Sequence, residues 1–205
     1  MCGGVAAQNA GTIEDNTLKN IVVKNYDNAL GSKLGVVAGE NLSTGEILLP
    51  GAPSIDNCQV LAEANDAKMG GIAGANAGLI TTKGYKDDGS VSKSLVKCSL
   101  VLDKASYASM GGVAGSNTGT ISHISVDADI EGNLQAGFSG YGGIAGTSGY
   151  SMKSESLAAA SEANKKYPAT IIDCSFDGSL HAVGTSGNPA NIGGVTGVNG
   201  YGSQI

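Results

Sequence analysis

The chain contains 205 residues and carries a net charge of −6 at pH 7. Its 12 basic residues are scattered, so no basic stripe is present for phosphate groups, and this argues against nucleic acid as a partner. Aromatic residues make up 4%, whereas glycine reaches 33 residues, about twice its usual share. No run approaches the roughly 18 apolar residues that a membrane span requires, so we expect a soluble chain packed from small aliphatic side chains.

One glycine-rich heptapeptide recurs six times along the chain, and its fourth copy reads Gly-Gly-Val-Ala-Gly-Ser-Asn at 111–117. The other copies begin at Gly3, Gly35, Gly70, Gly142 and Gly193. The hydrophobic residues at their centres are 32, 35, 41, 31 and 51 residues apart. Repetition at this spacing predicts a repeat array, which we expect to span residues 1–205 as one unit and to be a fragment of a longer protein.

A second pattern lies between the copies and places Cys or Ile between hydrophobic residues, as in Ile55…Cys58…Val60. Alternating apolar and polar residues follow, as at 126–130, which is typical of a strand. Each unit thus offers about three short β segments, and no helix recurs. We therefore predict an all-β fold, a right-handed parallel β-helix (β-solenoid) of about five to six coils stacked about 4.8 Å apart.

Four segments interrupt the repeat. The stretches 42–53, 81–93 and 133–141 have the composition of loops. The fourth, 151–168, combines alanines with an early Glu155, late Lys165 and Lys166, and a terminal Pro168. These features predict a short helical insert that lies against the side of the stack.

Stacked coils place equivalent residues in columns. The asparagine at the end of each heptapeptide forms one such column, in which Asn tolerates turn geometry and the side-chain amides can hydrogen-bond along the array. We interpret this column as structural, although binding is conceivable. Its members are Asn9, Asn41, Asn76, Asn117 and Asn199, with Ser148 in one coil.

A second column contains Cys58, Cys98 and Cys174, and Ile21 and Ile124 take the same position in other units. The exchange of Cys for Ile indicates an apolar, inward-facing site, where Cys acts as a small hydrophobe. Parallel side chains are poorly oriented for a disulfide. Without a CxxC motif or a pair of histidines, we expect no zinc or other cofactor.

Acidic residues suggest two outward columns, one with Glu63, Asp103 and Asp129, the other with Asp127 and Asp177. Stacked carboxylates could recruit Ca²⁺ or serve as the paired acids of a polysaccharide-degrading enzyme. Solvated surface charge is the default interpretation.

The two histidines, His123 and His181, occupy different parts of their units and lie in no nucleophile motif, so we expect no catalytic residues.

The segments 70–80 and 111–121, each a heptapeptide followed by x-Gly-x-Ile, and Ile-x-x-Cys-Ser-Phe at 171–176, resemble GLUG-motif repeats. Such repeats occur in large bacterial cell-surface and secreted proteins, among them adhesin-like proteins and the non-catalytic N-terminal regions of immunoglobulin A peptidases. The resemblance covers nearly all of the chain. It implies an extracellular β-solenoid and brings no catalytic residues, since the peptidases' zinc motif is absent here.

These observations predict a non-catalytic extracellular region that acts as a rigid stalk or display surface. Its partner would be a host protein or glycan, met by the loops and the helical insert. One alternative is a polysaccharide-degrading enzyme. Another is an assembly module, because coil edges left open within a repeat could make end-to-end contact with further repeats.

Overall fold

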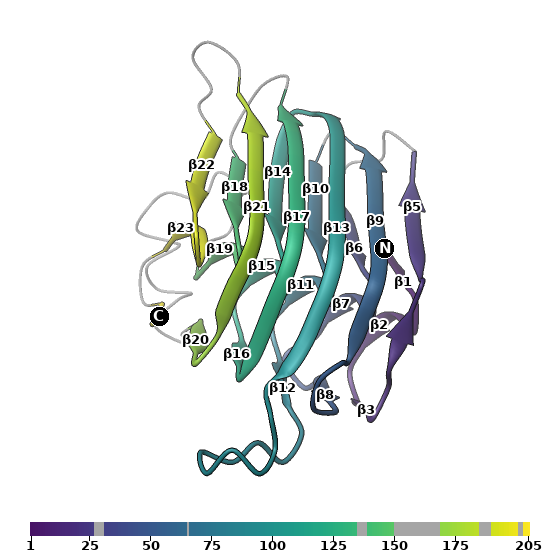
Figure 1. Ribbon diagram of the computed structural model, residues 1–205. Coiled ribbons are helices and arrows are strands. Elements are labelled where there is room, and N and C mark those ends of the chain that lie inside the picture. Colours follow the sequence, from purple (N-terminus) through teal and green to yellow (C-terminus); the bar gives the residue numbers. More distant parts are fainter. Residues whose placement is uncertain (27–30, 65, 135–138, 150–168, 185–189, 201–202) are drawn as a thin grey trace.

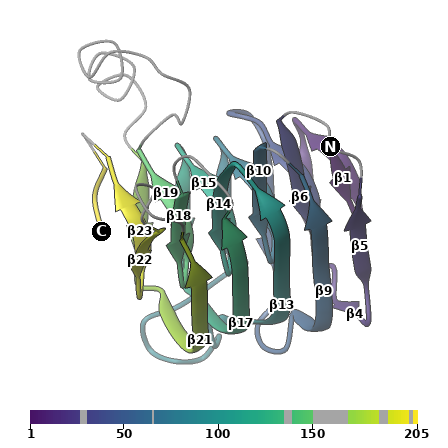
Figure 2. The same cartoon turned by 90° about the horizontal axis from the view of Figure 1, so that it is seen from above.

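The computed structural model describes residues 1–26, 31–64, 66–134, 139–149, 169–184, 190–200 and 203–205. Its named strands pair in parallel and form four sheets, which we call sheets A to D (Figure 1). The chain visits the sheets in the order A, B, C, D and then steps to the next coil. Seen from above, the coils follow one another from the N-terminal to the C-terminal side (Figure 2).

Sheets A and B are built from the heptapeptide copies and the residues before them. Sheet A contains β1 (Cys2–Gly3), β6 (Ser32–Gly35), β10 (Asp66–Gly70), β14 (Tyr107–Gly111), β18 (Ser139–Gly142) and β22 (Ala190–Gly193). Sheet B contains β2 (Ala6–Asn9), β7 (Ala38–Asn41), β11 (Ala73–Asn76), β15 (Ala114–Asn117), β19 (Ala145–Ser148) and β23 (Thr196–Asn199).

Sheet C is narrow, whereas sheet D has the longest strands. Sheet C contains β3 (Thr12–Glu14), β8 (Glu46–Leu49), β12 (Leu79–Thr82), β16 (Thr120–Ser122) and β20 (Thr170–Ile172). Sheet D contains β4 (Leu18–Lys19), β5 (Val22–Asn25), β9 (Ile55–Glu63), β13 (Ser94–Ala105), β17 (Ile124–Leu134) and β21 (Ser175–Val183). We number the coils by their sheet A strands, so that coil 1 begins at β1 and coil 6 at β22.

The predicted parallel β-solenoid is confirmed, with about six coils. The expected three strands per coil is wrong, because each complete coil contributes to four sheets. One heptapeptide supplies parts of two strands: β10 ends at Gly70 and β11 begins at Ala73, with a corner between them. At that corner the amides of Ile72 and Ala73 both donate to Val113 O of the next coil, at 2.9 and 3.0 Å.

The corners of coils 3 and 4 need glycine because the neighbouring coils approach closely there. A Cβ atom on Gly112 would lie 2.4 Å from the carbonyl oxygen of Gly143 in the next coil. The same contact would be 2.2 Å for Gly71 with Gly112 O. At these two positions glycine leaves room for the neighbouring backbone, whereas coil 2 places the buried Val36 at the equivalent position.

Two of the predicted loops begin or end elsewhere. Residues 42–53 are not all loop, because Glu46–Leu49 forms β8 and buries Ile47 and Leu49. The Gly and Pro residues on either side of this short strand gave the whole stretch the composition of a loop. Strand β12 runs through Thr82, which leaves 83–93 as the loop of coil 3. Around 133–141, strands occupy positions up to 134 and from 139, and 135–138 lie outside the described residues, as does the whole predicted helix at 151–168.

The core is a set of inward-facing columns of small and medium apolar residues. One column runs Leu34, Met69, Met110 and Tyr141 through sheet A, and all four are buried. The hydrophobic residues at the centres of the heptapeptides are more accessible in the outermost coils: Val5 is 44% and Val195 36% exposed, whereas Ile72 is fully buried. Each coil is therefore covered by its neighbours rather than by its own side chains.

Candidate functional site

The predicted asparagine residues lie in one column of sheet B, and the amides form a buried ladder. Asn9 Nδ2 donates to Asn41 Oδ1 at 2.9 Å, Asn41 to Asn76 at 2.8 Å, and Asn76 to Asn117 at 2.9 Å. Asn117 stacks beside Ser148, and Ser148 beside Asn199. Asn117 Nδ2 keeps the bond to a sheet C carbonyl that the other ladder asparagines also make, here to Thr170 O at 3.4 Å. Its ladder bond ends there, and the buried Ser148 hydroxyl has no hydrogen-bond partner among the described residues.

The ladder leaves little free bonding capacity for a ligand. Besides its neighbour's oxygen, Asn76 Nδ2 contacts Thr120 O at 3.3 Å, and Asn76 Oδ1 accepts the Gly78 amide at 3.2 Å. The side chain is 2% exposed. The geometry therefore assigns these amides to coil stacking.

The cysteine column contains only two of the three expected thiols. Cys98 pairs with Cys58 across β13 and β9, and the column continues through Ala128 and Gly178. Cys174 precedes Ser175, which pairs with Ser125, so Cys174 lies beside Ile124 in another column. The expectation of one column was wrong, because Ile124 pairs with Ser94, four residues before Cys98. All four cysteines are free, and burial raises the pKa of Cys98 to about 12 and of Cys174 to about 11.

The same error in the predicted register of β17 assigned one acidic residue to the wrong column. Asp103 pairs with Glu63 as predicted, and Asp127 with Asp177, but Asp129 pairs with Ser99 and Ser179. Sheet D thus presents outward rows that mix charges with small polar groups. Lys97 Nζ lies 3.3 Å from Asp127 Oδ2, and the Ser179 hydroxyl donates to Asp129 Oδ1 at 2.6 Å.

A surface hollow of about 300 Å³ opens on this outer face of sheet D between β9, β13 and β17; we call it the sheet D hollow. At its β9 side, Asn57 adopts a positive φ of 52° and adds one residue to the strand, so the register with β13 shifts. Its polar lining includes Asn57, Gln59, Lys97, Ser99, Asp127 and Asp129. A larger hollow of about 510 Å³, which we call the threonine hollow, lies beside sheet C and is lined mainly by Ser, Thr and Gly residues, together with Glu46, Ala77 and Leu79.

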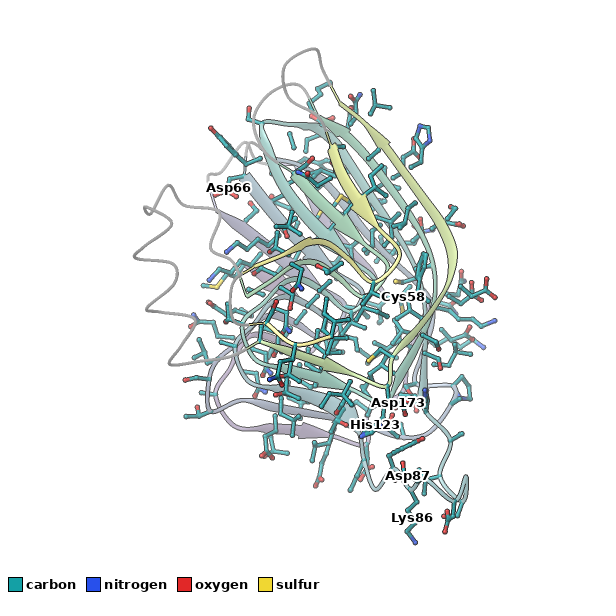
Figure 3. All side chains as sticks on the ribbon, turned by 90° about the vertical axis from the view of Figure 1, so that its left-hand side faces the viewer. Cys58, Asp66, Lys86, Asp87, His123 and Asp173 are labelled. Atoms are coloured by element: carbon teal, nitrogen blue, oxygen red, sulfur yellow. The ribbon has the colours of Figure 1, made fainter. Side chains whose placement is uncertain are left out.

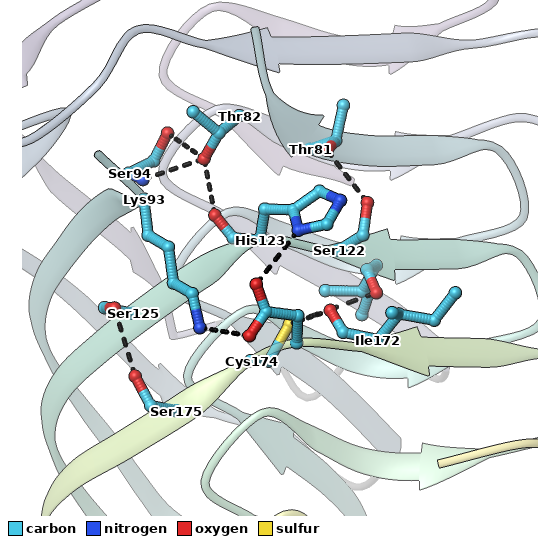
Figure 4. Close-up of polar contacts among 12 residues, drawn as sticks. Thr81, Thr82, Lys93, Ser94, Ser122, His123, Ser125, Ile172, Cys174 and Ser175 are labelled. Carbon is cyan, nitrogen blue, oxygen red and sulfur yellow. Dashed lines mark hydrogen bonds and ion pairs between the residues drawn. The ribbon is translucent and has the colours of Figure 1, made fainter. Parts of the chain in front are cut away.

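The loop 83–93 of coil 3 is tied to a corner between sheets C and D. The Tyr85 ring stacks on His123, with centroids 4.1 Å apart and planes 13° apart. His123 Nδ1 lies 3.1 Å from Asp173 Oδ2, and Lys93 makes an ion pair with Asp173 (Figure 4). The hydrogen bond from Lys93, and to a smaller extent the one from His123, lower the pKa of Asp173 to about 2. Asp87 and Lys86 lie farther out along the loop than this corner (Figure 3).

The start of the loop reaches in the opposite direction along the stack. Lys83 forms ion pairs with Glu14, at 3.1 Å, and with Asp15 in coil 1. Lys93 contacts Asp173 in coil 5, so one loop of coil 3 joins carboxylates two coils away on either side. We call these contacts the loop brace. The Tyr85–His123 stack carries no sequence signal, but the Ile121-x-x-Ile124 and Ile171-x-x-Cys174 patterns align His123 with Asp173.

Comparison with protein-family models, with curated proteins and with solved structures gave no match. Among the residues that the structure describes, no group of three or more His, Cys, Asp or Glu side chains is arranged to hold a metal ion. No helix within the described ranges is long and apolar enough to cross a membrane.

Proposed function

We propose that this chain is the non-catalytic β-solenoid region of a bacterial cell-surface or secreted protein, where it acts as a rigid scaffold that displays binding surfaces to a protein or glycan. The observation that carries the proposal is the loop brace. A loop that contacts coils 1, 4 and 5 from coil 3 is held in one position, and it also resists sliding between coils. Preorganised surfaces of this kind favour recognition, because little conformational entropy is lost on binding.

The likeness of the repeats to GLUG motifs supports an extracellular location for the scaffold. The described polar groups support display rather than catalysis. His123 is engaged by Asp173 and Tyr85, and both mapped hollows are surface depressions on the outside of the coils.

Two measurements test the proposal. Antibodies against the purified chain should label intact cells of the bacterium that produces it, or detect the protein in the medium. Labelling that appears only after lysis would contradict the extracellular location. The purified chain should also release no reducing ends from a panel of plant, fungal and bacterial polysaccharides. Cleavage of any of them would replace the scaffold with the enzymatic alternative.

A further inference from the structure

Two features of the sequence form the sheet D hollow: a short side chain between longer ones, and an extra residue in β9. Its floor is Ser99, a short side chain flanked in the same outward row by the longer Gln59 and Asp129. The extra residue at Asn57 widens the β9 side. A small residue between two long ones leaves a depression across three strands, at the lower end of the ~300–1,000 Å³ range of small-molecule sites.

The groups around the hollow retain hydrogen-bonding capacity of both kinds. The Gln59 amide and the Ser99 hydroxyl make no side-chain hydrogen bonds to other described residues, so each can donate and accept. Lys97 uses one direction for Asp127 and keeps further N–H donors. Asp129 accepts from Ser179 through Oδ1 and keeps Oδ2 as an acceptor.

This combination selects among ligand classes. The carboxylates of Asp127 and Asp129, in a chain of net charge −6, oppose phosphates and acidic polymers. The described lining offers no aromatic or large aliphatic side chain, which leaves little to hold an apolar ligand. Hydroxyl groups that both donate and accept match the mixture of amide, hydroxyl, ammonium and carboxylate.

We propose that the sheet D hollow binds a neutral oligosaccharide whose chain runs across the strands, along the axis of the solenoid. The outward row Gln59–Ser99–Asp129–Ser179 presents one polar group per coil, about every 4.8 Å, so successive sugar residues meet successive coils. This proposal rests on the display function above and names the ligand class for one of its surfaces.

Isothermal titration of the whole chain against neutral cello-, xylo-, malto- and chito-oligosaccharides tests the site. At least one series should bind, and affinity should rise with chain length until the row is filled. Polygalacturonate should not bind. If no neutral series binds at millimolar concentration, the proposal is overturned, and surface labelling of cells would still support the display function on its own.

Three variants locate the site. Gln59→Ala removes an amide, and Ser99→Gln fills the floor; each should weaken binding about fivefold or more, the effect of losing one hydrogen bond. The matched control is Thr120→Gln, the same kind of enlargement in the threonine hollow, which should leave affinity unchanged. Equal melting temperatures for the three variants ensure that folding is not being measured. Loss of binding in Thr120→Gln alone would place the ligand elsewhere and overturn the assignment.

Discussion

Asn76 connects three coils through a single side chain. Its nitrogen donates to Asn117 and to the Thr120 carbonyl, while its oxygen accepts from Asn41 and from Gly78 of its own turn. Hydrogen bonds in such a buried chain polarise one another, whereas an unpaired buried amide is costly. The asparagine column is therefore a continuous network rather than a set of separate turns.

Replacing Asn117 by Ala removes the acceptor of Asn76 Nδ2 and of the Gly119 amide, and the donor to Thr170 O. At about 1 kcal/mol for each bond, we expect the free energy of unfolding to fall by about 3 kcal/mol in urea denaturation. Asn199→Ala, at the exposed end of the column, should cost much less. Equal stability of Asn117→Ala and the wild type would argue against a stabilising ladder.

The cysteines provide a second test at the scale of single residues. In disulfide exchange the cysteine thiolate attacks the disulfide of the reagent, and burial raises the pKa of Cys58, Cys98 and Cys174, which lowers the thiolate fraction. In a Cys2→Ser background at pH 8, the folded chain should therefore react slowly, and all three thiols should react at once in denaturant. Rapid labelling of Cys98 in the folded chain would contradict its burial.

At the scale of an element, the Gly-Gly corner joins sheet A to sheet B. The first glycine of each copy ends its sheet A strand. The second residue, glycine in every coil except coil 2, lies at the turn into sheet B. The same motif position has different surroundings in different coils: a Cβ on Gly112 would lie 2.4 Å from Gly143 O and from Val126 Cγ1, whereas one on Gly194 meets no described atom within 4 Å.

Gly112→Ala should therefore destabilise the chain by at least about 1–3 kcal/mol through overpacking. Gly194→Ala is the matched control and should change stability by no more than about 0.5 kcal/mol, the usual range for surface changes. Thermal and urea unfolding measure both variants. Similar losses would mean that glycine acts here through backbone conformation rather than through coil contact.

The elements differ in how far the sequence predicts them. The heptapeptide copies predict the solenoid because a repeated Gly-Gly-x-x-x-x-Asn pattern must stack in register. In sheet D, the predicted alignment of the three cysteines in one column was wrong. Coils 2 and 3 insert extra residues before β9 and β13, whereas His123 alone separates β16 from β17. The alternation of apolar and polar residues predicts whether a side chain points inward or outward. The number of residues between two strands decides which residue it pairs with in the next coil.

Neither the sheet D hollow nor the loop brace could be predicted from the sequence, because both depend on contacts between coils. The sheet D hollow depends on the partners of Ser99 and on the bulge at Asn57, which register alone supplies. The loop brace depends on long side chains that reach across two coils, and no local pattern links Lys93 to Asp173.

On the scale of the whole molecule, most contacts join a coil to its nearest neighbours, so stability is close to a sum over adjacent coils. The loop brace is an exception, since coil 3 contacts coils 1 and 5 directly. Its contribution depends on pH. The pKa of Asp173 in the folded chain, about 2, is below the ~3.9 of an unfolded aspartate. The ionised carboxylate therefore stabilises the fold above that range, and this stabilisation is lost as the pH falls through about 2.

Lys93→Met should lower the melting temperature at pH 7, and the difference from the wild type should shrink as the pH approaches 2. Lys86→Met, which changes the same residue type in the exposed part of the loop, should have little effect at either pH. Calorimetry at both pH values provides the measurement. A difference between Lys93→Met and the wild type that stays constant with pH would exclude the ion pair with Asp173 as its cause.

The amides of the asparagine ladder all point the same way, each nitrogen toward the later coil. A gene segment that encodes one complete coil, from one asparagine to the next, carries one donor and one acceptor at matching ends. Within coils 1 to 4, duplicating or deleting such a segment leaves the hydrogen-bonded chain unbroken, because an asparagine stands at both of its ends. The ladder thus defines a unit by which this architecture could lengthen or shorten, one whole coil at a time, with the amide hydrogen bonds kept at each junction between asparagines.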